Sequence, residues 1–345
     1  MQRPLLLCLL ILSLAGCAAR GVITLLPELD GQGTDLQRVF IASNRLSGSD
    51  DASQFIFEQD FGDVRDPNMR YGSILISIPP GHRTGNIEWP GAEEPDPQRH
   101  FVASDQRTFA DARAFLKALD ASGRQPREVV VFVHGYNVNN AEAVYRLAQI
   151  AQDFDAKVPV IAFSWPSAGN PRGYVYDRDS VMFSRDDLET LLTALTGPGD
   201  RKVLLVAHSM GSQLVMETLR QMAISGNRGA LADISGVALI SPDIDEDVFV
   251  QQARRITPFP QPSTLMVSDR DRALNLAAFL TGKPARLGSI TDPGRLGNLP
   301  VQVVDLSDIE GGDRGGHTTA FTAPAAIRLL RDLATGASEL IEGAF

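Results

Sequence analysis

The sequence has few cysteines and few basic residues for its length of 345 residues. Its two cysteines, Cys8 and Cys17, both lie near the start, so the rest of the chain forms no disulfide bond and no cysteine-based metal cluster. The net charge is −10 and no block of lysine or arginine occurs, which argues against a nucleic-acid partner. Repeats and low-complexity tracts are also absent. An acidic surface of this kind indicates solubility.

The one strongly hydrophobic run is a targeting signal. Residues 5–14 follow a positive start at Arg3 and are too few to span a bilayer, but their number suits the core of a signal peptide. The run ends in Leu-Ala-Gly-Cys at residues 14–17, which resembles the lipobox of bacterial lipoproteins. That resemblance implies cleavage before Cys17 and its lipidation. An ordinary signal peptide cut at an alanine site is the alternative.

From residue 128 onward, apolar strand patterns alternate with helical patterns, which predicts a mainly parallel sheet with helices on both faces. Strands are predicted at residues 129–133, 158–163, 202–206, 236–240, 264–267 and 301–304, with helices at 141–154, 185–195, 213–224, 246–256, 272–280 and 324–333. Before this region we predict strands at 39–42 and 71–78, a loop at 82–97 and a helix at 106–119. His82 and His100 are expected to be surface or capping side chains.

The pentapeptide Ala-His-Ser-Met-Gly at residues 207–211 lies between a predicted strand and a predicted helix. This is the context of a nucleophile elbow, a tight turn that needs small residues two positions before and after the serine. Gly211 meets this need, and Ala207 stands where glycine is common. Ser209 would lie at a helix N-terminus, where negative charge is favoured. The alternative is that Ser209 only caps an ordinary helix.

Two further segments complete a catalytic pattern. The strand at 129–133 runs into His134-Gly135, where Gly135 allows the backbone N–H of Tyr136 to face the nucleophile; the N–H of Met210 would be the second donor of an oxyanion hole. His134 is expected to support this loop. After Ser209 the chain contains one histidine, His317, in a glycine-rich loop that follows the last predicted strand. It is the expected general base.

The acid of the triad is less clearly marked. Asp269 and Asp271 both follow the strand at 264–267, and Asp243 follows the preceding strand. Carboxylates at helix starts are often caps, so spacing alone does not choose among them. We prefer Asp271, with Asp269 and Asp243 as alternatives.

These motifs together resemble a bacterial α/β-hydrolase group, long catalogued as a domain of unknown function and described as esterase- or lipase-like. The resemblance covers most of residues 38–335. It implies that Asp271, which precedes Arg-Ala-Leu, is the acid, and it implies no particular substrate. The matching segments are residues 42–45, 77–79 with His82 and Gly85, 131–136, 163–167, 207–211, 242–249, 268–274 and 316–317.

The predicted organisation is a signal peptide (1–16), a lipidated N-terminus and spacer (17–37), a β-rich N-terminal extension (38–125) and an α/β-hydrolase domain (126–345). Trp165, Pro166, Tyr174 and Tyr176 either line an acyl pocket or belong to the core, and residues 169–184 are a candidate lid.

The predicted function is hydrolysis of a small-molecule or lipid ester, or a thioester, through an acyl-enzyme on Ser209, with no metal or cofactor. Two alternatives stay open: an inactive envelope lipoprotein that uses the scaffold for binding, and an acyltransferase or amidase with the same triad. The expected location is the cell envelope, attached to the membrane through the lipid. Because Ala18 and not aspartate follows Cys17, the resemblance to lipoprotein sorting signals favours the outer membrane.

Overall fold

The computed structural model describes residues 20–27, 34–46, 63–122, 127–197, 201–282 and 286–331. The predicted signal peptide and Cys17 lie outside the described residues. Within these ranges, no helix combines the length and the apolar character needed to cross a membrane.

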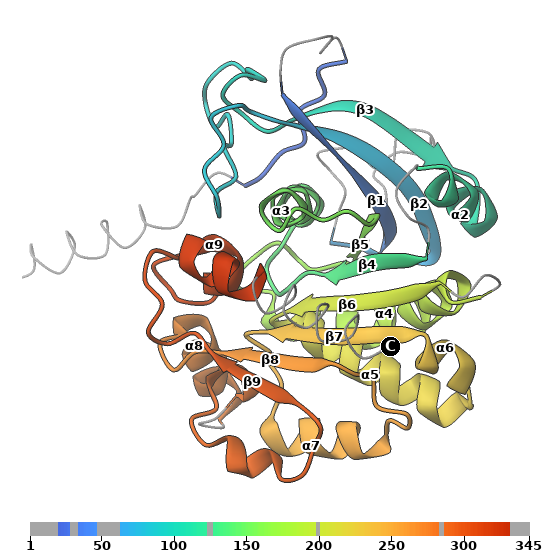
Figure 1. Ribbon diagram of the computed structural model, residues 1–345, viewed down its shortest axis with the longest axis vertical. Helices are drawn as coiled ribbons and strands as arrows, with labels where there is room; N and C mark the ends of the chain where they lie inside the picture. Colours follow the sequence, from blue (N-terminus) through green and yellow to red (C-terminus); the bar gives the residue numbers. More distant parts are fainter. Residues whose placement is uncertain are drawn as a thin grey trace, which may run out of the picture.

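One sheet of nine strands forms the centre of the described chain, in the order β3-β2-β1-β5-β4-β6-β7-β8-β9 (Figure 1). β1 and β2 pair antiparallel, as do β2 and β3, and all other neighbours are parallel. The segment expected as an N-terminal extension therefore supplies three strands of the same sheet. The strands are β1 (Asp35–Arg45), β2 (Arg65–Ile78), β3 (Val102–Phe109), β4 (Glu128–Val133), β5 (Val160–Ser164), β6 (Lys202–His208), β7 (Ile234–Ile240), β8 (Ser263–Val267) and β9 (Gln302–Asp305).

Helices cover both faces of this sheet, and Figure 1 shows α3 and α9 on one side and α5, α6 and α7 on the other. The described helices are α2 (Ala112–Asp120), α3 (Asn140–Asp153), α4 (Tyr174–Leu195), α5 (Met210–Ser225), α6 (Arg228–Ala232), α7 (Glu246–Arg255), α8 (Arg272–Thr281), the short 3-10 helices η1 (Leu287–Ser289) and η2 (Pro293–Leu296), and α9 (Thr319–Thr322). Residues 324–331 are also helical.

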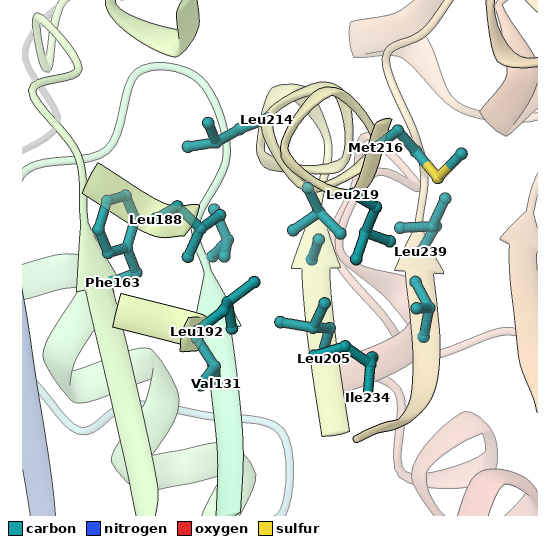
Figure 2. Packing of buried hydrophobic residues seen from close by; sticks show 14 of the residues in the cluster. Val131, Phe163, Leu188, Leu192, Leu205, Leu214, Met216, Leu219, Ile234 and Leu239 are labelled. Carbon is teal, nitrogen blue, oxygen red and sulfur yellow. The ribbon is translucent and has the colours of Figure 1, made fainter. Parts of the chain in front are cut away.

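The alternation of side chains along each strand separates two cores. Val131, Leu205 and Leu239 point towards α4 and α5, where they contact Leu192 and Leu219 (Figure 2). The neighbouring strand residues point the other way, towards α3 and the C-terminal helical residues. Because both faces are buried, the parallel strands read as nearly continuous apolar runs.

The predicted helix at 106–119 is wrong in its first half. Residues up to Phe109 belong to β3, which pairs with β2, and α2 begins only at Ala112. Asp111 separates the two elements, because its side chain accepts a hydrogen bond from the N–H of Ala114 and caps the helix. Phe109 contacts Phe115 with ring centroids 6.0 Å apart. The apolar residues of β3 and α2 happen to follow a helical spacing across this strand-to-helix turn.

Most of the candidate lid at 169–184 forms the first part of helix α4. Helix α4 begins at Tyr174, eleven residues before the predicted start of that helix, and buries Asp177, Val181 and Ser184. One face of this helix packs against the core, and Val175 and Met182 lie on its exposed face. The short helix α6 was not predicted.

His82 is a partly buried side chain that bridges two carboxylates. Its Nδ1 lies 2.8 Å from Glu88 Oε2, and its Nε2 lies 3.0 Å from Asp153 Oδ1 at the end of α3. Burial of the ring lowers the pKa of His82, but the hydrogen bonds with Asp153 and Glu88 outweigh burial and raise it to about 9 from an ordinary 6.5. His100 is buried, and its Nδ1 accepts the N–H of Asp96.

The raised pKa of His82 makes stability depend on pH. A group with a higher pKa in the folded state stabilises the fold fully below its unfolded pKa, near 6.5, and this contribution is lost as pH rises through about 9. We therefore expect the thermal midpoint to fall over this interval, and to fall less in His82→Gln. Thermal unfolding monitored by circular dichroism measures both slopes; equal slopes would contradict the bridge.

Candidate active site

Ser209 lies in a strained turn between β6 and α5. Its φ of 52° and ψ of −123° lie outside the regions that L-residues ordinarily adopt. The turn is held on both sides: the N–H of Ser209 donates to Ile240 O at 2.9 Å, and its carbonyl accepts the N–H of Asp243 at 3.2 Å. Strain of this kind persists only where surrounding contacts enforce it, and it is concentrated at functional sites.

The small residues around Ser209 are required by close backbone contacts. A Cβ on Gly211 would lie 2.3 Å from the carbonyl oxygen of His134, at the end of β4. A Cβ on Gly135 would lie 2.8 Å from Cβ of Ser209. The loop after β4 is thus pressed directly against the serine. Ala207 is fully buried and pairs with β4 on one side and β7 on the other, so its position calls for a small side chain.

The two predicted oxyanion donors lie at this contact. Met210 is the first residue of α5, and Tyr136 follows Gly135 in the loop that contacts Ser209. In the described part of the chain, neither backbone N–H has a hydrogen-bond acceptor. Backbone donors left unpaired beside a strained serine can bind a negatively charged oxygen.

His134 supports this loop, as expected. Its Nδ1 lies 2.9 Å from Gly135 O, and its ring stacks on that of Trp165 with centroids 4.9 Å apart. Burial, with the charge of Arg45, lowers the pKa of His134 to about 3. The ring is therefore neutral, and its Nε2 lies 3.3 Å from Nη2 of Arg45 and 3.1 Å from Trp165 O. Trp165 is completely buried and belongs to the core.

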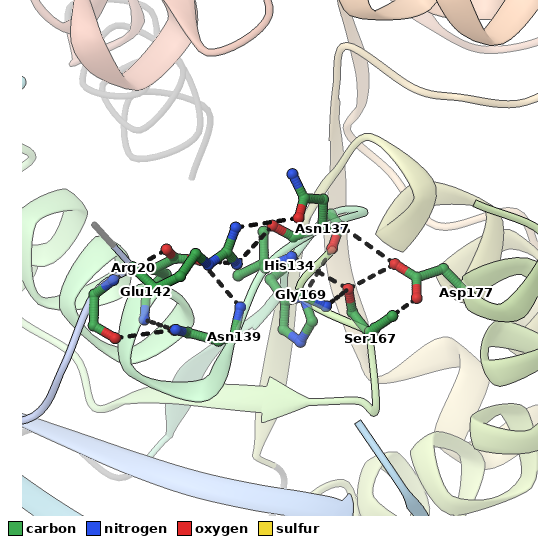
Figure 3. Close-up of polar contacts among 12 residues, drawn as sticks. Arg20, His134, Asn137, Asn139, Glu142, Ser167, Gly169 and Asp177 are labelled. Atoms are coloured by element: carbon green, nitrogen blue, oxygen red, sulfur yellow. Dashed lines mark hydrogen bonds and ion pairs between the residues drawn. The ribbon is translucent and has the colours of Figure 1, made fainter. Parts of the chain in front are cut away.

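Arg45 and Asp177 hold the loops around the site, and sequence reasoning assigned neither a role. The buried Arg45 donates to Val138 O at 2.9 Å and to Ser167 O at 3.1 Å, which joins the loop after β4 to the loop after β5. Asp177 accepts from Ser167 Oγ at 2.6 Å and from the N–H of Asn137 at 3.1 Å (Figure 3). A charged residue ending the apolar strand β1 was the available signal for Arg45.

His317 and Asp271 form a pair close to Ser209. The His317 Nδ1 lies 2.7 Å from Asp271 Oδ2, and the Asp271 side chain is fully buried. The other Asp271 oxygen caps α8 by accepting the N–H of Leu274 at 3.0 Å. The carbonyl of His317 contacts Nε2 of His208, the residue before Ser209, at 3.1 Å.

The loop that carries His317 is held by Asp313. Its carboxylate accepts the N–H groups of Gly315, His317 and Thr318 at 3.1, 3.3 and 2.7 Å. These hydrogen bonds outweigh burial and lower the pKa of Asp313. Among the described residues, no hydrogen bond joins the Ser209 hydroxyl to His317; such contacts often form only when substrate is bound.

The structure does not bring the two alternative acids to His317. Asp243 is buried in an ion pair with Arg286, at 2.5 Å from Nε, and accepts the Tyr174 hydroxyl at 2.9 Å. Asp269 is exposed, and its N–H donates to Ser307 Oγ.

The two tyrosines proposed for an acyl pocket have separate structural roles. Tyr174 binds Asp243, and its ring contacts that of Tyr136 with centroids 5.4 Å apart. The Tyr176 hydroxyl donates to Asp63 O, and the Arg65 guanidinium lies over the Tyr176 ring. Tyr176 therefore lies against the segment that enters β2.

Comparison with known proteins gives one family match. Residues 110–333 match the family described as α/β hydrolase of unknown function (DUF900). An uncharacterised protein from Nostoc sp. (strain PCC 7120) is 28% identical over 122 residues, which is 28% of this chain and 32% of that protein. The match thus spans about a third of that relative's length.

Two solved structures are similar at lower identity. A dienelactone hydrolase from Anabaena variabilis is 13% identical, with 78% of this chain and 90% of that chain covered and a TM-score of 0.37. Lipase B from Aspergillus fumigatus is 16% identical, with 65% and 57% covered and a TM-score of 0.38.

Proposed function

This chain belongs to the α/β-hydrolase family of unknown function, and we propose that it is a serine hydrolase that cleaves a carboxylic ester or thioester through an acyl-enzyme. The predicted fold, a mainly parallel central sheet covered by helices on both faces, is confirmed by the family match and the sheet topology. Ser209 is the proposed nucleophile, His317 the general base and Asp271 the acid that orients His317.

In the proposed reaction, Ser209 Oγ attacks the ester carbonyl carbon while His317 Nε2 takes the hydroxyl proton. The N–H groups of Tyr136 and Met210 bind the oxyanion that forms. His317 then gives its proton to the leaving oxygen or sulfur, and the bond to the leaving group breaks. A water molecule releases the acyl group by the same steps, with His317 again taking and returning a proton.

The observation that carries the proposal is that four separate segments of the chain meet at one place. The strained Ser209, the His317–Asp271 pair and the unpaired N–H groups lie on the loops after β6, β8, β9 and β4. A binding scaffold has no need to keep a strained serine, a buried carboxylate–histidine pair and two unpaired amides together. This favours catalysis over the inactive alternative.

Hydrolysis of a short p-nitrophenyl ester by the purified protein tests this proposal. We expect turnover in the wild type and an acyl adduct on Ser209 when the reaction is quenched in acid and analysed by mass spectrometry. Turnover that persists in Ser209→Ala would contradict the serine mechanism. Turnover by the wild type with no adduct on Ser209 would also count against it.

We also propose that a lipid on Cys17 attaches the protein to the cell envelope. The proposal rests on the lipobox-like residues 14–17. We expect the wild type to partition into the detergent phase of Triton X-114 and the Cys17→Ser variant to remain in the aqueous phase or unprocessed. Equal partitioning of both proteins would contradict lipidation at this residue.

A further inference from the structure

A pocket of about 270 Å³ lies between α3, α9 and the loop that carries Trp89. Its walls include residues next to the proposed nucleophile and the proposed base: Gly135 and His208 beside Ser209, and Thr318 beside His317. The remaining lining is largely apolar and aromatic, with Trp89 and Phe321 among it, and its charged side chains are Arg146 and Glu142. This volume suits a short acyl group.

The distinctive polar group of this pocket is Arg146 on α3. Its guanidinium lies over the Phe321 ring, 5.1 Å from the centroid. One of its terminal nitrogens donates to Gln149 Oε1 at 2.6 Å and to Gly85 O at 3.4 Å. Burial lowers the pKa of Arg146 to about 10, so the side chain remains charged at neutral pH.

The carboxylates near Arg146 are engaged elsewhere. Asp153 binds His82 and the N–H of Gly85. Asp313 binds the backbone of the loop that carries His317. Glu142, which shares the pocket, is paired with Arg20 at 2.6 Å and accepts the N–H of Asn139. In the described part of the chain, no carboxylate forms an ion pair with Arg146. Its direct hydrogen bonds go to neutral acceptors, and the nearby carboxylates act on its charge only through space, so the guanidinium can bind an anion in the pocket.

We propose that this pocket binds the acyl part of the substrate, and that Arg146 binds an anionic group at the far end of that acyl chain. The substrate class is then an ester or thioester of a short acid that carries a second negative group, a carboxylate or a phosphate. Arginine suits both anions because its planar donors match their oxygens. This inference rests on the proposed serine hydrolase function, since it places the acyl chain beside Ser209.

The first test compares two p-nitrophenyl esters of equal acyl length, the hemiglutarate and the neutral pentanoate. We expect the wild type to favour the hemiglutarate in kcat/KM, and Arg146→Gln to reduce this preference about 10- to 100-fold, as for a hydrogen bond to a charged group. Arg146→Lys keeps the charge and should retain part of the preference. Arg328→Gln, which removes an exposed arginine outside the pocket, should retain all of it.

A second test does not depend on catalysis. Trp89 lines the pocket, so titration of the Ser209→Ala protein with glutarate or inorganic phosphate should change its tryptophan fluorescence. The response should be lost in Arg146→Gln and kept in Arg146→Lys and Arg328→Gln. Whichever anion binds more tightly identifies a carboxylate or a phosphate as the preferred group.

The outcomes separate the two proposals. Cleavage of the pentanoate with no preference for the hemiglutarate and no anion binding would overturn the pocket assignment and leave the serine hydrolase intact. Anion binding that depends on Arg146, without cleavage of either ester, would support the pocket and count against the hydrolase. If Arg146→Gln does not fold, Arg146→Lys serves as the test. Salt screens the attraction between two charges, so a preference of this variant for the hemiglutarate that does not change with increasing salt would overturn the assignment.

Discussion

Replacement of Ser209 by alanine is expected to abolish measurable ester hydrolysis, with a loss of about 10⁴- to 10⁶-fold in kcat. The alanine removes the only oxygen at the elbow that could attack a carbonyl and keeps the backbone contacts of Ser209 with Ile240 and Asp243. The fold should therefore remain, and initial rates on a p-nitrophenyl ester measure the change.

A second buried serine provides a matched control. Ser212 lies in the first turn of α5, where its hydroxyl donates to Ala207 O at 3.3 Å. Ser212→Ala removes one neutral hydrogen bond and should leave kcat within a few-fold of the wild type. A comparable loss of activity in both variants would mean that the elbow has been disturbed, not that a nucleophile has been removed.

Replacement of Asp271 by asparagine is expected to lower kcat by about 10⁴-fold, the effect known for this change in serine triads. An asparagine amide can donate to His317 Nδ1, which holds the ring in the tautomer that cannot take a proton from Ser209. The single amide oxygen of the asparagine can still accept the N–H of Leu274, so the cap of α8 and the fold are kept. Steady-state kinetics together with a thermal midpoint test both parts of this expectation.

Variants of the two alternative acids, Asp269 and Asp243, distinguish a loss of catalysis from a loss of stability. Asp269→Asn changes an exposed side chain and should leave kcat nearly unchanged. Asp243→Asn leaves the buried Arg286 without its counter-charge, which typically costs about 3–5 kcal/mol of stability. Its thermal midpoint should fall well below that of Asp271→Asn. A 10⁴-fold loss in Asp269→Asn with full activity in Asp271→Asn would show that the wrong acid has been chosen.

The parallel part of the fold was predictable because local patterns and burial agree there. β4, β6, β7 and β8 are apolar runs of the length of a strand, and the turn at Ser209 requires small neighbours that the sequence supplies. The strand-to-helix turn at Asp111 was missed because the apolar residues of β3 and α2 happen to follow one helical period. The first half of α4 was missed because its exposed face includes Val175 and Met182, which blur the pattern.

The side-chain network around the site was less predictable. Asp269 and Asp271 are two residues apart, and only the turn that starts α8 decides which one points at His317. Arg45 lies far from Val138 and Ser167 in sequence, so no local spacing links them. The bridge from His82 to Asp153 likewise joins a loop to a helix end 71 residues away. Contacts of this kind depend on the assembled sheet.

Labelling with a fluorophosphonate tests the central claim most directly, because this probe reacts with serines activated by a base and not with ordinary serines. We predict that the purified wild type gains one phosphonate adduct and that peptide mass spectrometry maps it to Ser209. We predict labelling of Ser212→Ala and none of Ser209→Ala or His317→Ala. An unlabelled but folded wild type, or an adduct on another residue, would contradict the assignment of Ser209 as the nucleophile.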